Sequence, residues 1–125
     1  MYLLDTSALI DVFMDSPSGK KIRDFIRGKD YYLSSITIYE IGKAKSKKDS
    51  MIYFIKNSAV LTLTIEAAEK ASKMYKELLE KGQLINEMDL LIAGIATSKN
   101  LTVITSDRDF EKLAKYIQEF DVKTF

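Results

Sequence analysis

The sequence contains neither cysteine nor histidine, and these two absences exclude much of enzyme chemistry. Without cysteine there is no disulfide, no thiolate nucleophile and no cysteine-based zinc site. Without histidine the chain lacks the commonest general base and cannot form a Ser-His-Asp triad. Any catalysis must therefore use carboxylates, Lys, Tyr, Ser or Thr, and carboxylates alone favour hard cations such as Mg²⁺ or Mn²⁺.

Long apolar runs and an excess of one charge are also missing. No segment approaches the roughly 20 apolar residues that cross a bilayer, and residues 1–5 lack the features of a signal peptide. We therefore expect a cytoplasmic protein that makes no membrane contact. The 19 basic and 18 acidic residues give a net charge of +1, so any surface for nucleic acid must be a local patch.

The chain contains enough material for one folded domain. Its 125 residues suit a single core, and a content of 46% hydrophobic and 30% charged residues is ordinary for a globular protein. Pro17, the single proline, lies in a polar stretch that predicts a turn between helices. No repeat or linker divides the sequence, so we expect one domain over residues 1–125.

Strand and helix patterns alternate along the chain. Short β-type runs predict strands at residues 2–4, 31–33, 60–63, 102–105 and 121–123. Helical spacing of apolar residues predicts helices at 6–14, 18–27, 36–44, 48–55, from 65 to about 82, at 86–98 and at 107–116. The alternation predicts an α/β fold with a parallel sheet of four to five strands and helices on both faces.

The helix that ends near Gly82 has the clearest pattern. Its apolar residues form one predicted stripe, made of Ile65, Ala68, Ala71, Tyr75, Leu78 and Leu79. Glu69 and Lys73 are one of several pairs of opposite charge spaced four residues apart, which predicts ion pairs on the outer face of the helix.

Acidic residues recur near the ends of the predicted strands, where parallel α/β sheets bind ligands. Asp5 closes the first strand, but an N-cap for the following helix explains it equally well. Glu40 follows the second strand, and taken alone it is better explained by a capping box with Thr37. Asp107 follows the fourth strand, beside Asp109, which could form a capping box with Ser106.

Asp89 is the acidic residue that a structural role explains least well. It could close a capping box begun by Asn86. However, its face of the helix continues through Ile92, Ala93 and Ala96, and a carboxylate heading an apolar face is rarely buried without a partner. Four carboxylates near one edge would repel one another, and a divalent cation would relieve that repulsion. Spacing alone leaves open whether the four side chains meet.

Four segments, in this order, resemble the motifs of PIN-domain nucleases. The first three are Leu3–Ser7, Ser34–Ile41 and Asp89–Ala96, the last preceded by residues 82–85. The fourth, Val103–Phe110, is a strand that ends in Thr-x-Asp and is followed by Asp-Phe. Chain length and the helix before Gly82 look most like the VapC-type toxins of toxin–antitoxin pairs. One departure is Gly94, where the family more often has Ala, and we expect it to matter little.

The resemblance implies a PIN-like fold and an endoribonuclease that leaves a 3′-hydroxyl and a 5′-phosphate. It implies a catalytic and metal-binding quartet of Asp5, Glu40, Asp89 and Asp107, which would hold one or two Mg²⁺ or Mn²⁺ ions, with Asp109 as a further metal ligand. Thr6, Ser7 and Thr105 match hydroxyl positions that support those residues. It also implies RNA as substrate, a small antitoxin protein as partner and a homodimer, although the sequence does not locate the surfaces involved.

Basic residues must compensate an acidic pocket if it is to bind RNA. Lys43 and Lys45 follow the Glu40 motif and Arg108 follows Asp107, so we expect these three to contact phosphates. A solvated helix end explains the lysines about as well.

Three alternatives to the toxin remain at this point. An RNA-processing PIN nuclease without an antitoxin would carry the same motifs. A receiver-type phosphoacceptor domain also has acids at strand ends, but it would need paired acids after the first strand and a Lys after a late one. A non-catalytic RNA- or protein-binding module would not need an intact quartet.

Overall fold

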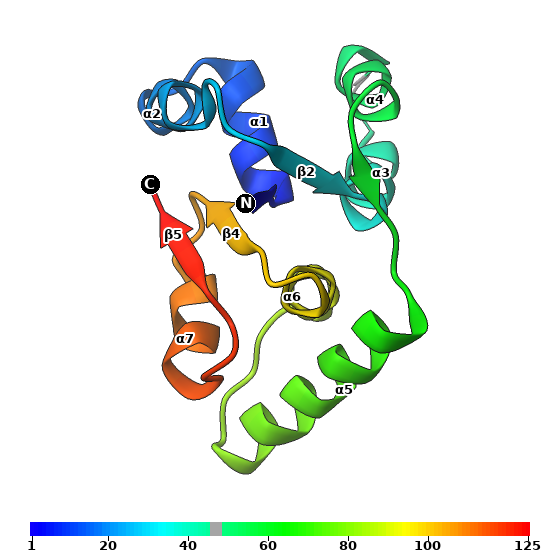
Figure 1. Ribbon diagram of the computed structural model, residues 1–125, viewed down its shortest axis with the longest axis vertical. Helices are drawn as coiled ribbons and strands as arrows, with labels where there is room; N and C mark the ends of the chain where they lie inside the picture. Colours follow the sequence, from blue (N-terminus) through cyan, green and yellow to red (C-terminus); the bar gives the residue numbers. More distant parts are fainter. Residues whose placement is uncertain (46–48) are drawn as a thin grey trace.

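The computed structural model describes residues 1–45 and 49–125, which form a five-stranded sheet flanked by helices (Figure 1). The strands are β1 (Tyr2–Leu4), β2 (Tyr31–Ser34), β3 (Val60–Leu61), β4 (Thr102–Thr105) and β5 (Val122–Thr124). All neighbouring strands are parallel, in the order β3-β2-β1-β4-β5. The predicted α/β class and parallel sheet are therefore confirmed.

Helices cover both faces of this sheet. They are α1 (Thr6–Met14), α2 (Pro17–Ile26), α3 (Ser35–Gly42), α4 (Asp49–Lys56), α5 (Ile65–Glu80), α6 (Glu87–Ser98) and α7 (Asp109–Tyr116). Figure 1 shows α1 to α4 on one side and α5 to α7 on the other. No helix in the described part of the chain combines the length and apolarity needed to cross a membrane.

Side-chain alternation along the central strand creates two separate cores. Leu3 packs into a cluster with residues of α5, α6 and α7, whereas Leu4 packs into a cluster with residues of α1 to α4. Both side chains are almost completely buried, as expected for a central parallel strand covered on both faces. β1 thus fixes the position of whatever follows it, which is Asp5.

The structure divides the predicted stripe of α5 between two faces. Ala71 and Leu78 are buried, together with Ala67 and Met74, which the predicted stripe omitted. Ile65, Tyr75 and Leu79 from the same predicted stripe are exposed. The expected ion pairs along the helix are not formed within the described residues, and Lys70 instead lies 3.6 Å from Glu119.

Helices α5 and α6 pack unusually closely at Gly94. A Cβ atom built there would lie 2.4 Å from the carbonyl oxygen of Ala67 and 3.0 Å from the Cβ of Ala71. A side chain at this position would push the two helices apart. The expectation that Gly94 matters little is therefore wrong for this chain.

Candidate active site

A hollow of about 310 Å³ opens at the carboxyl edge of the sheet. It is lined by Asp5, Thr6, Ser7, Ile10, Glu40, Asn86, Asp89, Asp107 and Asp109. The five acidic residues expected at the site therefore lie around one cavity, although they come from the β1–α1 junction, α3, α6, the β4–α7 connection and the first residue of α7. None of these described lining residues is Lys or Arg.

Asp5 is the most deeply fixed of the carboxylates, with 2% of its surface exposed. Its Oδ1 accepts a hydrogen bond from the backbone N–H of Ala8 at 2.8 Å, and its Oδ2 accepts one from the Thr105 hydroxyl at 2.7 Å. The Ser7 hydroxyl lies 3.0 Å from both oxygens. Burial raises the pKa of Asp5 to about 6, although these hydrogen bonds oppose the increase.

Glu40 is held by a chain of hydroxyl groups. The Thr6 hydroxyl donates to Glu40 Oε1 at 2.6 Å, and its oxygen lies 3.0 Å from the Thr37 hydroxyl, which in turn lies 3.4 Å from the Ser34 hydroxyl. Each hydroxyl has one proton to donate. Because Thr6 gives its proton to Glu40, Thr37 must donate to Thr6. This series of hydroxyl groups thus directs its protons toward the Glu40 carboxylate.

Asp107 lies at the rim of the hollow, in the connection between β4 and α7. Its backbone N–H donates to the Thr105 hydroxyl at 2.9 Å, and its Oδ1 accepts from the backbone N–H of Asp109 at 2.9 Å. The Thr105 hydroxyl therefore forms hydrogen bonds with two acidic residues. It donates to the Asp5 carboxylate and accepts from the backbone N–H of Asp107. Asp109 is more exposed, and its carboxylate lies 3.8 Å from the ammonium of Lys112.

Asp89 has no side-chain hydrogen bond to any described residue and is only half-buried. Burial, followed by the charges of Asp5, Asp107, Glu40 and Asp109 in that order, together raise its pKa to about 7. Asp89 thus experiences all four of the other acidic residues. These repulsions are not offset, because no Lys or Arg is among the residues that line the hollow.

The structure also tests the capping roles proposed from sequence. Asp5 is indeed the N-cap of α1, so its capping and its place in the hollow coexist. The capping box of Thr37 and Glu40 is wrong, because Ser34 caps α3 and Glu40 lies near the other end of that helix. Arg108 occupies the N-cap position of α7 and its side chain forms no capping hydrogen bond, so the Ser106–Asp109 box is wrong as well.

The lining of the hollow is chemically suited to a hard divalent cation. All five acidic side chains offer oxygen, the ligand atom that Mg²⁺ and Mn²⁺ prefer. In residues 1–45 and 49–125, no three acidic side chains converge closely enough to hold one ion in their present positions. Binding an ion would therefore require some of the carboxylates to rotate, and Asp89 is free to do so.

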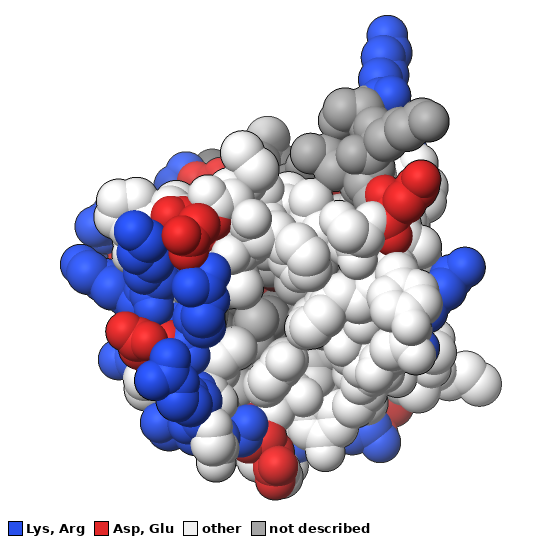
Figure 2. Space-filling model, turned by 90° about the horizontal axis from the view of Figure 1, so that it is seen from above, with Lys and Arg blue, Asp and Glu red and all other residues white. Residues whose placement is uncertain are grey.

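The basic residues expected to contact RNA lie outside the hollow. Lys43 follows the end of α3, with its ammonium 5.1 Å from the ring of Tyr39, and Arg108 lies 3.4 Å from Glu111. Lys45 is exposed beyond α3. Figure 2 shows that Lys and Arg gather mainly at one side of the face seen from above.

Sequence reasoning missed three polar residues of the site. Ser34 and Thr37 complete the hydroxyl chain to Glu40, and Asn86 lines the hollow while its Oδ1 accepts from the backbone N–H of Met88 at 2.8 Å. The position of Ser34 was a usable signal. It is a polar residue at the carboxyl end of β2, just as Asp5 lies at the carboxyl end of β1. Thr37 and Asn86 were considered only as helix caps.

The fold agrees with the comparison to known families. The chain belongs to the PIN domain family, whose pattern it matches over residues 2–116. It is 30% identical to the tRNA(fMet)-specific endonuclease VapC of Salmonella typhimurium over 120 residues, which cover 90% of this chain and 91% of that protein. It is 28% identical to ribonuclease VapC1 of Methanocaldococcus jannaschii over 125 residues, covering 98% and 85%.

Solved structures show the same fold. VapBC2 from Rickettsia felis, bound to a DNA fragment from its promoter, contains a chain that superposes with a TM-score of 0.79 at 23% identity, covering 99% of this chain and 98% of that one. VapBC-5 from Mycobacterium tuberculosis gives a TM-score of 0.75 at 23% identity, covering 98% and 97%. At these identities the similarity establishes the fold.

Proposed function

We propose that this chain is an endoribonuclease that hydrolyses RNA phosphodiester bonds with the help of Mg²⁺ or Mn²⁺. The observation that carries the proposal is the hollow lined by five carboxylates, with no basic residue among its lining. Such a cluster is costly for a folded chain unless a cation neutralises it. The names of the VapC relatives, a ribonuclease and an endonuclease acting on tRNA, support RNA as the substrate.

The acidic residues divide into fixed and adjustable groups. Asp5 and Glu40 are oriented by hydroxyl donors, so they would present their remaining lone pairs in a fixed direction. Asp89 and Asp107 would complete the ligand set, with Asp109 as a further ligand at the rim. When bound, the cation would activate a water molecule and offset the negative charge that develops on the phosphate. The exposed Lys43, Lys45 and Arg108 would bind flanking phosphates.

We also propose that the protein is the toxin of a toxin–antitoxin pair. The similarity to VapC chains extends over nearly the full length of both partners, and several of the matching structures are VapBC complexes. A small antitoxin protein would therefore bind this chain. Induced expression tests the role, since the chain should arrest growth and a small protein encoded beside it should relieve the arrest.

Cleavage of a panel of RNAs tests the enzymatic proposal directly. The chain should cleave with Mg²⁺ or Mn²⁺ and lose activity in chelator, and Asp5→Asn should be inactive under all conditions. Asp24→Asn is a matched control, because Asp24 is an exposed carboxylate on α2 that pairs with Arg27 outside the hollow. Full activity of Asp5→Asn, or of the wild type in chelator, would overturn the proposal.

A further inference from the structure

Positive charge is concentrated in residues 20–29, which form most of α2 and the turn after it. Five of these ten residues are Lys or Arg and one, Asp24, is acidic, so the segment has a net charge of +4 whereas the whole chain has +1. Figure 2 shows Lys and Arg gathered on the side of the molecule where Figure 1 places α2. The remainder of the chain is therefore net acidic, and this segment forms a local patch that attracts anions.

Two lysine side chains converge on one aromatic ring at the edge of this patch. The ammonium of Lys29 lies 4.4 Å from the centre of the Phe25 ring, and the ammonium of Lys123, in β5, lies 5.1 Å from the same centre. Lys123 also lies 5.3 Å from the centre of the Phe125 ring, and the two rings are 5.4 Å apart. These four residues, the Phe25 cluster, join the end of α2 to the edge strand of the sheet.

The two ammonium groups of the Phe25 cluster keep donors that the fold does not use. Each ammonium has three N–H donors. Lys29 gives one of them to the carbonyl oxygen of Phe25 at 2.7 Å. Both lysines are exposed, and within residues 1–45 and 49–125 neither forms an ion pair with a carboxylate. Two positive charges held on one ring repel each other, and an anion bound between them would relieve that repulsion.

The surroundings of the Phe25 cluster indicate which anion it would bind. Lys21 lies four residues before Phe25 on α2, so the two side chains share one flank of the helix and Lys21 extends the row of positive charge. The rings of Phe25 and Phe125 are only partly buried. Positive charges that follow one another beside accessible aromatic rings are the combination with which proteins bind single-stranded nucleic acid.

The Phe25 cluster is connected to the acidic hollow through the two strands β4 and β5. The backbone N–H of Phe125 donates to the carbonyl oxygen of Thr105 at 2.9 Å, and the hydroxyl of Thr105 orients Asp5. Neighbouring strands of a sheet are about 4.8 Å apart, so the end of β5 lies directly beside the edge where the hollow opens. A strand of RNA with one phosphate in the hollow can therefore continue past Phe125 and reach Lys123.

We propose that the Phe25 cluster, extended by Lys21, binds the phosphate backbone of RNA on one side of the bond that is cleaved. Lys43 follows α3 on the β2 side of the sheet, and the Phe25 cluster lies on the β5 side. The carboxylates between these two basic regions repel RNA, so contacts on both sides hold the strand across the hollow. The inference rests on the proposed ribonuclease function and adds a binding region to the same site.

Binding of a labelled single-stranded RNA tests the site, with Asp5→Asn as the parent so that the RNA stays intact. Lys29→Gln with Lys123→Gln should weaken binding at least about tenfold and should lower the slope of log Kd against log salt by about 1.4, because each phosphate contact contributes about 0.7. Replacing both lysines by Arg keeps the charges and should preserve binding. Lys73→Gln with Lys76→Gln is the matched control, because it removes two exposed charges on α5, across the sheet from α2.

Cleavage kinetics in the active chain separate this site from the hollow. The glutamine pair at 29 and 123 should raise KM about tenfold and leave kcat almost unchanged, because the cluster lies outside the hollow. Shortening the RNA on one side of the cleaved bond should remove this difference from the wild type, and shortening it on the other side should preserve it. Thermal unfolding verifies that each variant is folded.

The outcomes distinguish this proposal from the proposed function. If the glutamine pair and the control pair bound RNA equally well, the proposal would be overturned even if an acidic protein bound the cluster, and the ribonuclease would stand. A KM difference that survives both shortened RNAs would overturn it as well. A chain that cleaves no RNA, yet loses RNA binding only in the glutamine pair, would overturn the proposed function and leave this site standing.

Discussion

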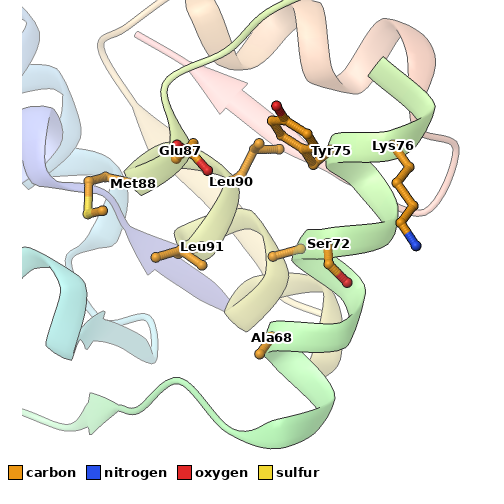
Figure 3. A pocket seen from close by; sticks show the side chains of 9 residues that line it. Ala68, Ser72, Tyr75, Lys76, Glu87, Met88, Leu90 and Leu91 are labelled. Atoms are coloured by element: carbon orange, nitrogen blue, oxygen red, sulfur yellow. The ribbon is translucent and has the colours of Figure 1, made fainter. Parts of the chain in front are cut away.

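The acidic hollow and an apolar groove between α5 and α6 lie on two sides of the same helix, yet their chemistries are opposite. Asp89 of α6 faces the hollow, and Leu91, two residues further on, faces the groove, which has a volume of about 460 Å³ (Figure 3). The groove is the larger cavity, but its lining is mostly apolar and includes one acidic residue, Glu87. The hollow is smaller and contains five carboxylates, one with a pKa near 7. Cavity size therefore says less about catalysis than the chemistry of the lining does.

The sharpest way to separate the two regions is Asp89→Asn. We expect at least a hundredfold loss of RNA cleavage, roughly 3 kcal/mol of transition-state stabilisation, because the amide cannot hold a cation as the carboxylate does. The stability of the fold should not decrease, since Asp89 does not line the groove and makes no side-chain hydrogen bond to a described residue. Single-turnover cleavage and thermal unfolding on the same preparation measure both effects. Parallel loss of both properties would show that the two regions are not independent.

The pH dependence of stability should report on the hollow alone. The pKa values of Asp5 and Asp89 are raised to about 6 and about 7, so the folded state holds protons that the unfolded state releases above about pH 4. Stability in chelator should therefore fall as pH rises from about 4 to about 7. Asp5 alone should account for about 3 kcal/mol of this loss, and the half-exposed Asp89 should add less than its shift implies.

Chemical denaturation at several pH values measures this slope. Asp89→Asn should flatten the upper part of the curve, and Mn²⁺ should restore stability to the wild type at pH 7. A stability that rises over this window would contradict the raised pKa values.

A methyl group at Gly94 should disturb the groove more than the hollow. Gly94→Ala places a Cβ against the Ala67 carbonyl, so we expect about 1 to 3 kcal/mol of destabilisation as α5 moves away from α6. Gly42→Ala is the matched control, because nothing lies within 4 Å of its added Cβ and Ala favours a helix. Thermal unfolding compares the two variants. Equal stability of both would mean that the helices adjust without cost.

The smallest effect is expected from the hydroxyl that holds Glu40. Thr6→Val keeps the shape of the side chain but removes the donor at 2.6 Å, so cleavage should fall about tenfold. Thr6→Ser keeps the donor and should retain most of the activity. The dependence of rate on cation concentration distinguishes weaker cation binding from a folding defect. If Thr6→Val cleaved RNA at the wild-type rate, the hydroxyl groups that hold Glu40 would have no role in the mechanism.

The elements of the fold differ in how closely the sequence predicted their bounds. The strand at 102–105 and the helix at 6–14 match the structure, because clear periodicity and an N-cap at Asp5 define them. The predicted start of α3 missed Ser35, because the N-capping ability of Ser34 was not considered. The predicted helix at 48–55 corresponds to α4, although Lys48 lies outside the described residues.

The acidic hollow was more predictable than the groove. Strand ends in a parallel sheet converge on one edge, so the positions of Asp5 and Asp107 followed from the alternation of strands and helices. The apolar residues of α5 read as a single stripe, because two faces that are each spaced by three and four residues overlap in sequence. Only the packing against α6 shows which of the two faces is buried. Gly94, which permits this packing, stood out in the sequence only as a departure from the Ala that the family more often has.

The hydrogen bond between Thr105 and Asp5 determines when, during synthesis of the protein, the site can form. It joins residues 100 positions apart, and β1 pairs with both β2 and β4. A chain still emerging from the ribosome holds Asp5 but neither Asp107 nor the hydroxyl that orients the first carboxylate. The site is therefore assembled only when translation is almost complete, so the proposed ribonuclease would be inactive for nearly all of the time its own message is being read.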